Sequence, residues 1–183
     1  MLRKLLHLSA IIIPVIYLLT DKRTALLVAT ALLAILSIFE ILRIGGWLRI
    51  GIVRKYTKEG EVKRPLGSFF YVLSAFITMA VFEKHIAIAS LFILSISDPL
   101  SSILGSRFGR IRFLGKTLEG TLTFFFSSMV ILLAFSFGIY SAVACAVVAS
   151  LTELFSRWPV DDNLSIPLAA AAALTLFTKV LCI

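Results

Sequence analysis

Charged residues are scarce in this chain, and their scarcity excludes an ordinary water-soluble globule. Asp, Glu, Lys and Arg make up 15% of the 183 residues, whereas typical soluble domains contain about a quarter. Hydrophobic residues make up 60%, and the mean hydropathy is +1.03. Because so few polar residues are available to face water, the sequence predicts an all-α, polytopic membrane protein.

Cysteine and histidine are also rare, with two of each. Cys145 lies in an apolar run and Cys182 lies at the C-terminal end, so neither has a neighbour suited to metal or redox chemistry. His7 and His85 complete no zinc site with them, and no serine triad can be assembled on one face. These absences exclude zinc chemistry and serine hydrolysis.

Apolar runs long enough, or nearly long enough, to span a bilayer are abundant by contrast. A spanning helix needs about 20 mostly apolar residues. We expect one integral membrane domain over residues 1–183, with about seven transmembrane helices. The candidates are Leu5–Thr20, Thr24–Leu42, Leu66–Phe82, Ile86–Leu104, Gly120–Phe137, Tyr140–Phe155 and Ile166–Cys182.

The basic residues predict a cytoplasmic N-terminus and an outside C-terminus. With that orientation, 14 of the 18 Lys and Arg fall in inner segments, where positive residues accumulate. The same rule explains the net charge of +8 without a nucleic-acid partner. The outer connections are too short to form a site. We therefore expect an active site facing the cytoplasm.

Asp98 is the most informative polar residue, because it lies inside an apolar run. A carboxylate there costs on the order of 3 kcal/mol or more, so it needs a partner or a function. Pro99 removes a backbone donor, and the pair reads as the start of a new half-helix, which predicts a broken helix lining a cavity. The spacing places Ser95, Asp98, Ser102 and Gly105 on one helix face. The competing interpretation is a proline kink with Asp98 neutral or paired to an inner arginine.

The next inner segment combines glycines, cations and hydroxyls, which is the chemistry that binds phosphate groups. A P-loop is excluded, because five residues rather than four separate Gly109 from Gly115. Arg110 and Arg112 could equally be topology anchors. Glu119 is a candidate for function, although an ordinary acid at a helix N-terminus competes with that interpretation. The candidate phosphate-binding residues are Gly105, Arg107, Gly109, Gly115, Lys116, Thr117 and Gly120.

Acidic residues at the end of the chain could supply oxygen ligands. Magnesium prefers such ligands and usually keeps waters and substrate phosphates as well. A solvated turn is the alternative for Asp161 and Asp162. The candidate metal ligands are Asp98, Glu119, Glu153, Asp161 and Asp162.

Basic residues near the N-terminus are candidates for phosphate or headgroup contact. Arg3 and His7 share a helix face, with Lys4 beside them. Arg64 ends the second basic segment. Glu40 and Arg43 are three residues apart and are expected to form a structural pair.

Five motifs together resemble the family of dolichol kinases, phytol kinases and CTP-dependent diacylglycerol kinases. Relatives in that family often have Gly-Asp-Ala where this chain has Ser97-Asp98-Pro99, which puts the local backbone in doubt. The matching segments, in the family's order, are Arg3–His7, Arg64–Gly67, Ser97–Gly109, Gly115–Thr121 and Glu153 with Asp161–Pro167.

The resemblance implies phosphoryl transfer from a nucleoside triphosphate, often CTP, to the hydroxyl of a membrane lipid. The acceptor could be a polyprenol, a phytol-like isoprenoid alcohol or a diacylglycerol. The resemblance also implies Mg²⁺ or another divalent cation as a cofactor, and it adds Asn163 to the nucleotide-binding candidates. The expected catalytic residues are Asp98, Lys116, Glu119 and Glu153.

Two other functions remain open from the sequence. A membrane cytidylyltransferase would make a CDP-lipid from CTP and a lipid phosphate with similar inner-face residues. A non-enzymatic lipid or ion carrier would also place an acid inside the membrane. The sequence leaves the oligomeric state open, with a homodimer as one option.

Overall fold

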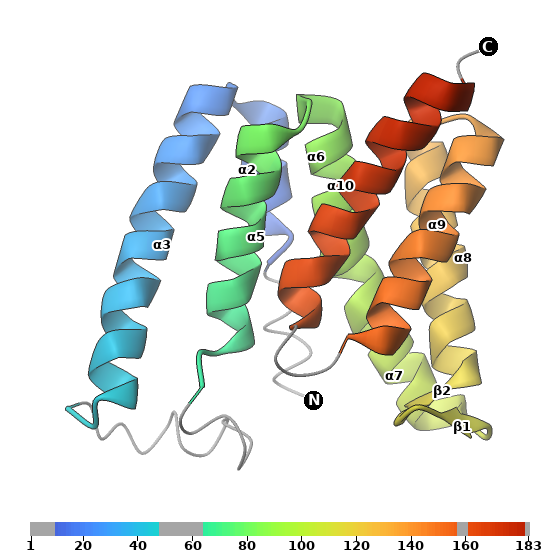
Figure 1. The fold of residues 1–183 in the computed structure, drawn as a ribbon, viewed down its shortest axis with the longest axis horizontal. Coiled ribbons are helices and arrows are strands. Elements are labelled where there is room, and N and C mark those ends of the chain that lie inside the picture. Colours follow the sequence, from blue (N-terminus) through green and yellow to red (C-terminus); the bar gives the residue numbers. More distant parts are fainter. Residues whose placement is uncertain (1–9, 48–63, 157–160, 182–183) are drawn as a thin grey trace.

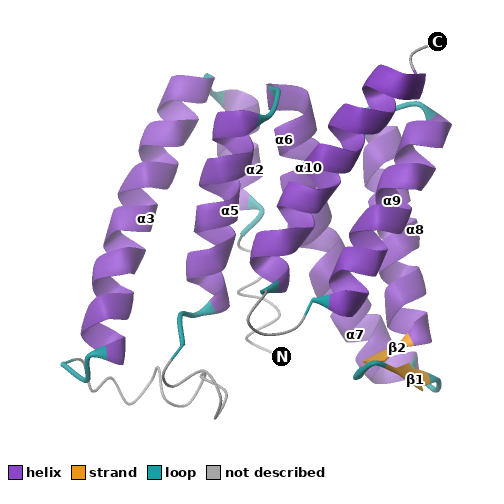
Figure 2. Cartoon of the chain, viewed as in Figure 1, coloured by secondary structure: helices purple, strands orange, loops and turns teal. Residues whose placement is uncertain are grey.

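The computed structural model describes residues 10–47, 64–156 and 161–181, and this part of the chain is almost entirely helical (Figures 1 and 2). Two very short strands form one antiparallel hairpin. The elements are α2 (Ile12–Leu19), α3 (Lys22–Ile44), α5 (Gly67–Val81), α6 (Lys84–Phe92), the π-helical segment η2 (Ile93–Ser97), α7 (Asp98–Phe108), β1 (Arg112–Phe113), β2 (Lys116–Thr117), α8 (Leu118–Ala134), α9 (Ile139–Phe155) and α10 (Asp162–Leu181).

The helices form a bundle in which α10 is the central element. It packs against α5, α6 and α9, whereas α3 packs against α2 and α5 at one edge of the bundle (Figure 1). The core between them is apolar and rich in alanine, including Ala149 and Ala170 with almost no exposed surface. Small side chains let these helices approach closely, as is usual where lipid replaces water as the solvent.

Large apolar side chains cover the outside of the bundle. On α9, Val143, Val147, Leu151 and Phe155 recur every four residues and are exposed, so they form one stripe along the helix. Three described helical stretches are long and apolar enough to cross a membrane, and α5, α8 and α9 are shorter apolar helices. A membrane protein is therefore supported, whereas the count of seven crossings and the N-in orientation remain predictions.

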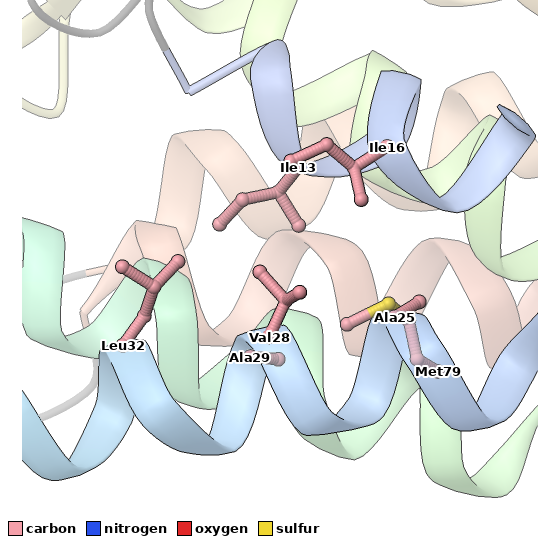
Figure 3. A pocket seen from close by; sticks show the side chains of 7 residues that line it. All are labelled: Ile13, Ile16, Ala25, Val28, Ala29, Leu32 and Met79. Carbon is pink, nitrogen blue, oxygen red and sulfur yellow. The ribbon is translucent and has the colours of Figure 1, made fainter. Parts of the chain in front are cut away.

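A small apolar cleft lies between α2, α3 and α5 (Figure 3). Seven side chains line it, and all are aliphatic or methionine. Such a lining has no polar side chain that could bind a phosphate group. The lining residues are Ile13, Ile16, Ala25, Val28, Ala29, Leu32 and Met79.

The predicted break of the helix at Asp98-Pro99 is wrong. The helix continues from α6 into α7, and the irregularity is the π-helical segment η2 just before Asp98. Pro99 has no backbone N–H to donate, and the π-helical turn accommodates this missing hydrogen bond without ending the helix. Along this helix, Ser95 and Ser101 are buried, Asp98 is half-buried and Ser102 is exposed.

Cations at the end of the bundle opposite β1 and β2 bind carbonyl groups at helix C-termini. Lys22 donates to the carbonyl of Ala80 at 2.9 Å, and Lys84 donates to that of Thr20 at 2.7 Å. The Nε2 of His85 likewise lies 2.8 Å from the carbonyl of Phe135. These side chains contact backbone groups that would otherwise be left without partners.

Candidate functional site

Charged residues from four separate elements, α7, β2, α9 and α10, interact with one another. Of these elements, β2 lies at one end of the bundle (Figure 1). Asp98 at the start of α7 interacts electrostatically with Lys116 on β2, Glu153 on α9, and Asp161 and Asp162 at the start of α10. The sequence predicted a role for each of these five residues. The fold therefore brings four of the five candidate metal ligands and one candidate catalytic lysine into one charged group, here called the acid–lysine cluster.

Lys116 and Glu153 form the central contact of this cluster. The Lys116 ammonium lies 2.5 Å from Glu153 Oε1 and donates to the backbone carbonyl of Glu153, also at 2.5 Å. The Glu153 side chain is 6% exposed and that of Lys116 is 27% exposed. Glu153 Oε2 is buried without a hydrogen-bond partner. One oxygen of a buried carboxylate is thus left to bind a further group.

Asp161 and Asn163 organise the start of α10. The Asp161 carboxylate accepts from the backbone N–H of Asn163 at 2.9 Å and from its side-chain amide at 2.8 Å, while the Asp161 carbonyl accepts from Ser165 N–H. These bonds cap the helix. Both Asp161 and Asp162 are partly buried, so the alternative of a freely solvated turn does not describe them.

Burial raises the pKa of the Asp161 carboxyl above its ordinary value, with Asp162 adding to the rise and the Asn163 hydrogen bonds opposing it. The charged form is thus less favourable in the folded protein than in the unfolded one. Its cost to stability grows as the pH rises from the ordinary value near 4 through the raised pKa of the folded protein.

We therefore expect Asp161→Asn to raise the melting temperature at pH 7 by about 2–4 °C, because asparagine keeps the capping oxygen without the charge. Below about pH 4 the two proteins should melt alike, since the aspartate is then protonated in both states. Thermal unfolding in detergent with a chelator, followed across this pH range, measures the difference. A lower melting temperature for the variant at pH 7 would contradict the assignment.

The hairpin that carries Lys116 is held by a tight turn and by α8. Leu114 and Gly115 form the two-residue turn with φ of +50° and +79°, the geometry of a type I′ hairpin, which favours glycine. Thr117 caps α8 through Gly120 N–H at 3.2 Å. The sequence analysis did not predict the hairpin, because its Leu-Gly turn lacks the usual Asn or Asp signal.

Glu119 contacts the hairpin rather than forming the centre of the cluster. Its Oε1 accepts from the backbone N–H groups of Arg110 and Ile111 at 2.8 and 3.3 Å. Its Oε2 is buried without a hydrogen-bond partner. In the described contacts, Glu119 thus orders the segment that leads into β1, and its predicted catalytic and metal-binding roles remain untested.

Three of the candidate phosphate-binding glycines lie where backbones approach closely. A Cβ on Gly105 would lie 2.6 Å from Thr117 Oγ1 and 3.2 Å from Gly120 Cα, and one on Gly120 would lie 3.2 Å from the Ser101 carbonyl oxygen. Gly109 is confined by Gly105 and Thr117 in the same way. Close packing of α7 on α8 therefore explains these glycines independently of any ligand.

Gly105→Ala is expected to lower the free energy of unfolding by about 1–3 kcal/mol, because the methyl group forces α7 and α8 apart. Thermal unfolding of the purified protein in lipid measures the loss. Gly138→Ala is the matched control, since its Cβ would meet nothing within 4 Å. Equal losses in the two variants would show that the helix contact is not the cause.

The remaining predicted residues are distributed around the cluster. Arg107 is exposed, with its guanidinium 5.4 Å from the Phe108 ring centre. Arg64 lies just before α5, and Gly67 at the start of that helix packs against the Asn163 side chain. Arg3, Lys4 and His7 lie outside the described residues, so their predicted contacts with phosphate are not tested.

The described residues contain no group of three or more His, Cys, Asp or Glu placed to hold a metal ion. A preformed all-protein cage is thus not present in this part of the chain. Magnesium does not require one, because it is commonly bound by one or two carboxylates together with substrate phosphates and water. The orphaned oxygen of Glu153, together with either Asp98 or Asp162, fits that partial set of ligands.

Sequence reasoning missed a group of buried polar contacts beside Asp98. Ser128 donates to Ser97 at 3.1 Å, and the Tyr71 hydroxyl lies 3.1 Å from Ser95 Oγ and donates to the Ala10 carbonyl. These bonds connect η2 to α8 and to α5. The only available signal was hydroxyl residues inside apolar runs, which does not name their partners.

Comparison with known proteins gives one match over nearly the whole chain. The uncharacterized protein RP860 of Rickettsia prowazekii is 31% identical over 193 residues, which cover 98% of this chain and 95% of that protein. The chain belongs to the same family as RP860. No family model matches the chain, and no solved structure matches it.

More distant similarity connects this family to membrane lipid kinases. CTP-dependent diacylglycerol kinase 1 of Schizosaccharomyces pombe is 28% identical over 144 residues, which cover 68% of this chain and 66% of the kinase. The dolichol kinase of Saccharomyces cerevisiae is 37% identical over 84 residues, which cover 44% of the chain but only 16% of that enzyme. These matches support a relation to membrane lipid kinases at the family level.

Proposed function

We propose that the protein is a membrane kinase that transfers a phosphoryl group from CTP, or another nucleoside triphosphate, to the hydroxyl of a lipid alcohol. The observation that carries this proposal is the acid–lysine cluster, in which Asp98 interacts with Lys116, Glu153 and Asp162 from three other elements. The cluster lies at the end of an apolar bundle that is distantly related to lipid kinases.

Phosphoryl transfer needs positioning and stabilisation of negative charge more than covalent chemistry. Lys116, with Arg107 and Arg64, would neutralise the triphosphate. One or two of Asp98, Glu153 and Asp162 would hold Mg²⁺, which when bound offsets charge on the phosphate oxygens. Because Lys116 is bound to Glu153 in this structure, a phosphate group must share or replace that contact.

The lipid acceptor would approach from the side of the bundle. Exposed apolar residues such as Leu100 and Ile103 lie on α7 within two turns of Asp98, so hydrocarbon can contact the helix that carries the carboxylate. A lipid hydroxyl at this depth would be near Asp98, which is the candidate to orient it or accept its proton.

The test is turnover by the purified protein in lipid, with a matrix of nucleotides and lipid alcohols read by mass spectrometry. CTP labelled separately at the α and γ positions identifies the transferred group. A kinase passes γ label to the lipid and releases CDP. Passage of α label into lipid would establish the cytidylyltransferase instead, and transport without any nucleotide turnover would establish a carrier.

A further inference from the structure

A buried ion pair lies at the end of α3, a helix with few buried residues. Of the residues of α3, only Ala25, Ala29 and Glu40 are buried. Arg43 donates to Glu40 Oε2 from Nε at 3.0 Å and from Nη2 at 2.5 Å. Both side chains are less than 10% exposed. A buried pair contributes little net stability, because desolvation offsets the attraction, so its geometry is the more informative property.

Both members of the pair also bind the backbone of the segment that precedes α5. Glu40 Oε1 accepts from Leu66 N–H at 3.1 Å, and Arg43 Nη2 donates to the Arg64 carbonyl. Pro65 between them has no N–H and disfavours helical backbone at Arg64. The pair therefore holds this segment by one backbone group on each side of Pro65, the Arg64 carbonyl and the Leu66 N–H.

The position of Glu40 also explains how α5 begins. Its N-cap residue is Leu66, which has no side-chain cap, and the first turn contains no acidic residue. The N-terminus of a helix carries a partial positive charge, and a nearby carboxylate stabilises it. Glu40 supplies that carboxylate from another helix, so the start of α5 depends on α3.

From the start of α5 the contacts continue to the acid–lysine cluster. Gly67 lies so close to the Asn163 amide that an added Cβ would be 2.8 Å from Nδ2. The same Nδ2 donates to Asp161 at 2.8 Å and to Asp162 at 3.2 Å. An unbroken set of contacts thus runs from Glu40 and Arg43, through Arg64–Gly67, to the acids at the start of α10.

We propose that Glu40 and Arg43 are positioning residues for the nucleotide, which fix the Arg64–Gly67 segment against Asn163 so that Arg64 is set beside the triphosphate. The inference rests on the proposed kinase function. Neither residue touches substrate. Because the pair already orders this segment in the free protein, less conformational entropy is lost when the nucleotide binds.

The experiment compares Glu40→Ala and Glu40→Gln with the wild-type protein in lipid. Asp21→Ala is the control, because Asp21 caps the opposite end of the same helix through Arg23 and Thr24. Amide hydrogen exchange over residues 64–70 measures the segment directly. Steady-state kinetics with CTP separates KM from kcat.

Glu40→Ala is expected to speed exchange at Leu66 and to raise the KM for CTP about tenfold, the effect of losing one charge-assisted hydrogen bond, with kcat nearly unchanged. Glu40→Gln keeps an acceptor oxygen and should give smaller changes of the same kind. Asp21→Ala should leave exchange at Leu66 and KM unchanged, although it weakens the cap.

If the Leu66 amide exchanges at the wild-type rate in Glu40→Ala, the positioning role of Glu40 and Arg43 is overturned, whatever the rate of CTP turnover. A fall in kcat with unchanged KM, or an equal rise in KM with Asp21→Ala, also overturns it. A wild-type protein that turns over no nucleotide instead contradicts the proposed function, and Leu66 exchange still decides whether Glu40 holds the segment. The two failures are thus distinguishable.

Discussion

Asp98→Asn is expected to lower kcat for phosphoryl transfer by roughly 10³-fold or more, while the protein remains folded in lipid. The substitution changes little volume, and the neighbouring bonds of Ser95 and Ser97 to Tyr71 and Ser128 are independent of the carboxylate. What is removed is the carboxyl group that interacts electrostatically with Lys116 and would bind magnesium or the lipid hydroxyl. Turnover of γ-labelled CTP with a lipid alcohol measures the loss.

Asp21→Asn is the matched control for this variant. It makes the same chemical change at the opposite end of the bundle, at an N-cap where asparagine serves as well as aspartate. Thermal unfolding of both variants reports whether the fold is retained. Activity of Asp98→Asn within about tenfold of the wild type would remove Asp98 from the proposed site, because essential charge stabilisation is worth far more.

Lys116→Met should abolish transfer and also destabilise the protein. The Glu153 carboxylate, 6% exposed, would be left as a buried charge without its cation. We expect the free energy of unfolding to fall by about 2–3 kcal/mol, less than for a fully buried pair because the Lys116 side chain is partly exposed. Denaturant or thermal unfolding in lipid measures this loss, and CTP turnover measures the activity.

The double variant Lys116→Met with Glu153→Gln separates the two effects. Neutral glutamine no longer needs a cation, so most of the stability should return. Activity should not return, because the triphosphate still lacks the lysine and the proposed Mg²⁺ site also lacks Glu153. If the double variant recovers both stability and turnover, the proposed roles of Lys116 at the nucleotide and of Glu153 at the metal are both wrong.

The sequence by itself determined the local features of this protein. Long apolar runs predict helices because each helix satisfies its own backbone hydrogen bonds, and the described helices match all seven predicted segments to within a few residues, apart from the undescribed start of the first. The pairing of Glu40 with Arg43 was also predictable, because three residues along a helix bring side chains together. The uneven charge distribution predicted a functional site on the cytoplasmic side, and that orientation remains a prediction.

The tertiary structure decided which polar residues meet and what each one contacts. Lys116 and Glu153 are 37 residues apart in the chain, and their contact depends on how β2 is folded back and where α9 ends. The π-helical segment before Asp98 packs against α8 and α10 and contacts Tyr71 of α5 through Ser95, whereas Pro99 alone suggested a break. Side-chain spacing specifies neighbours only within one helix. The partners across helices, including the hold of Glu40 on Leu66, follow from the packing of the whole bundle.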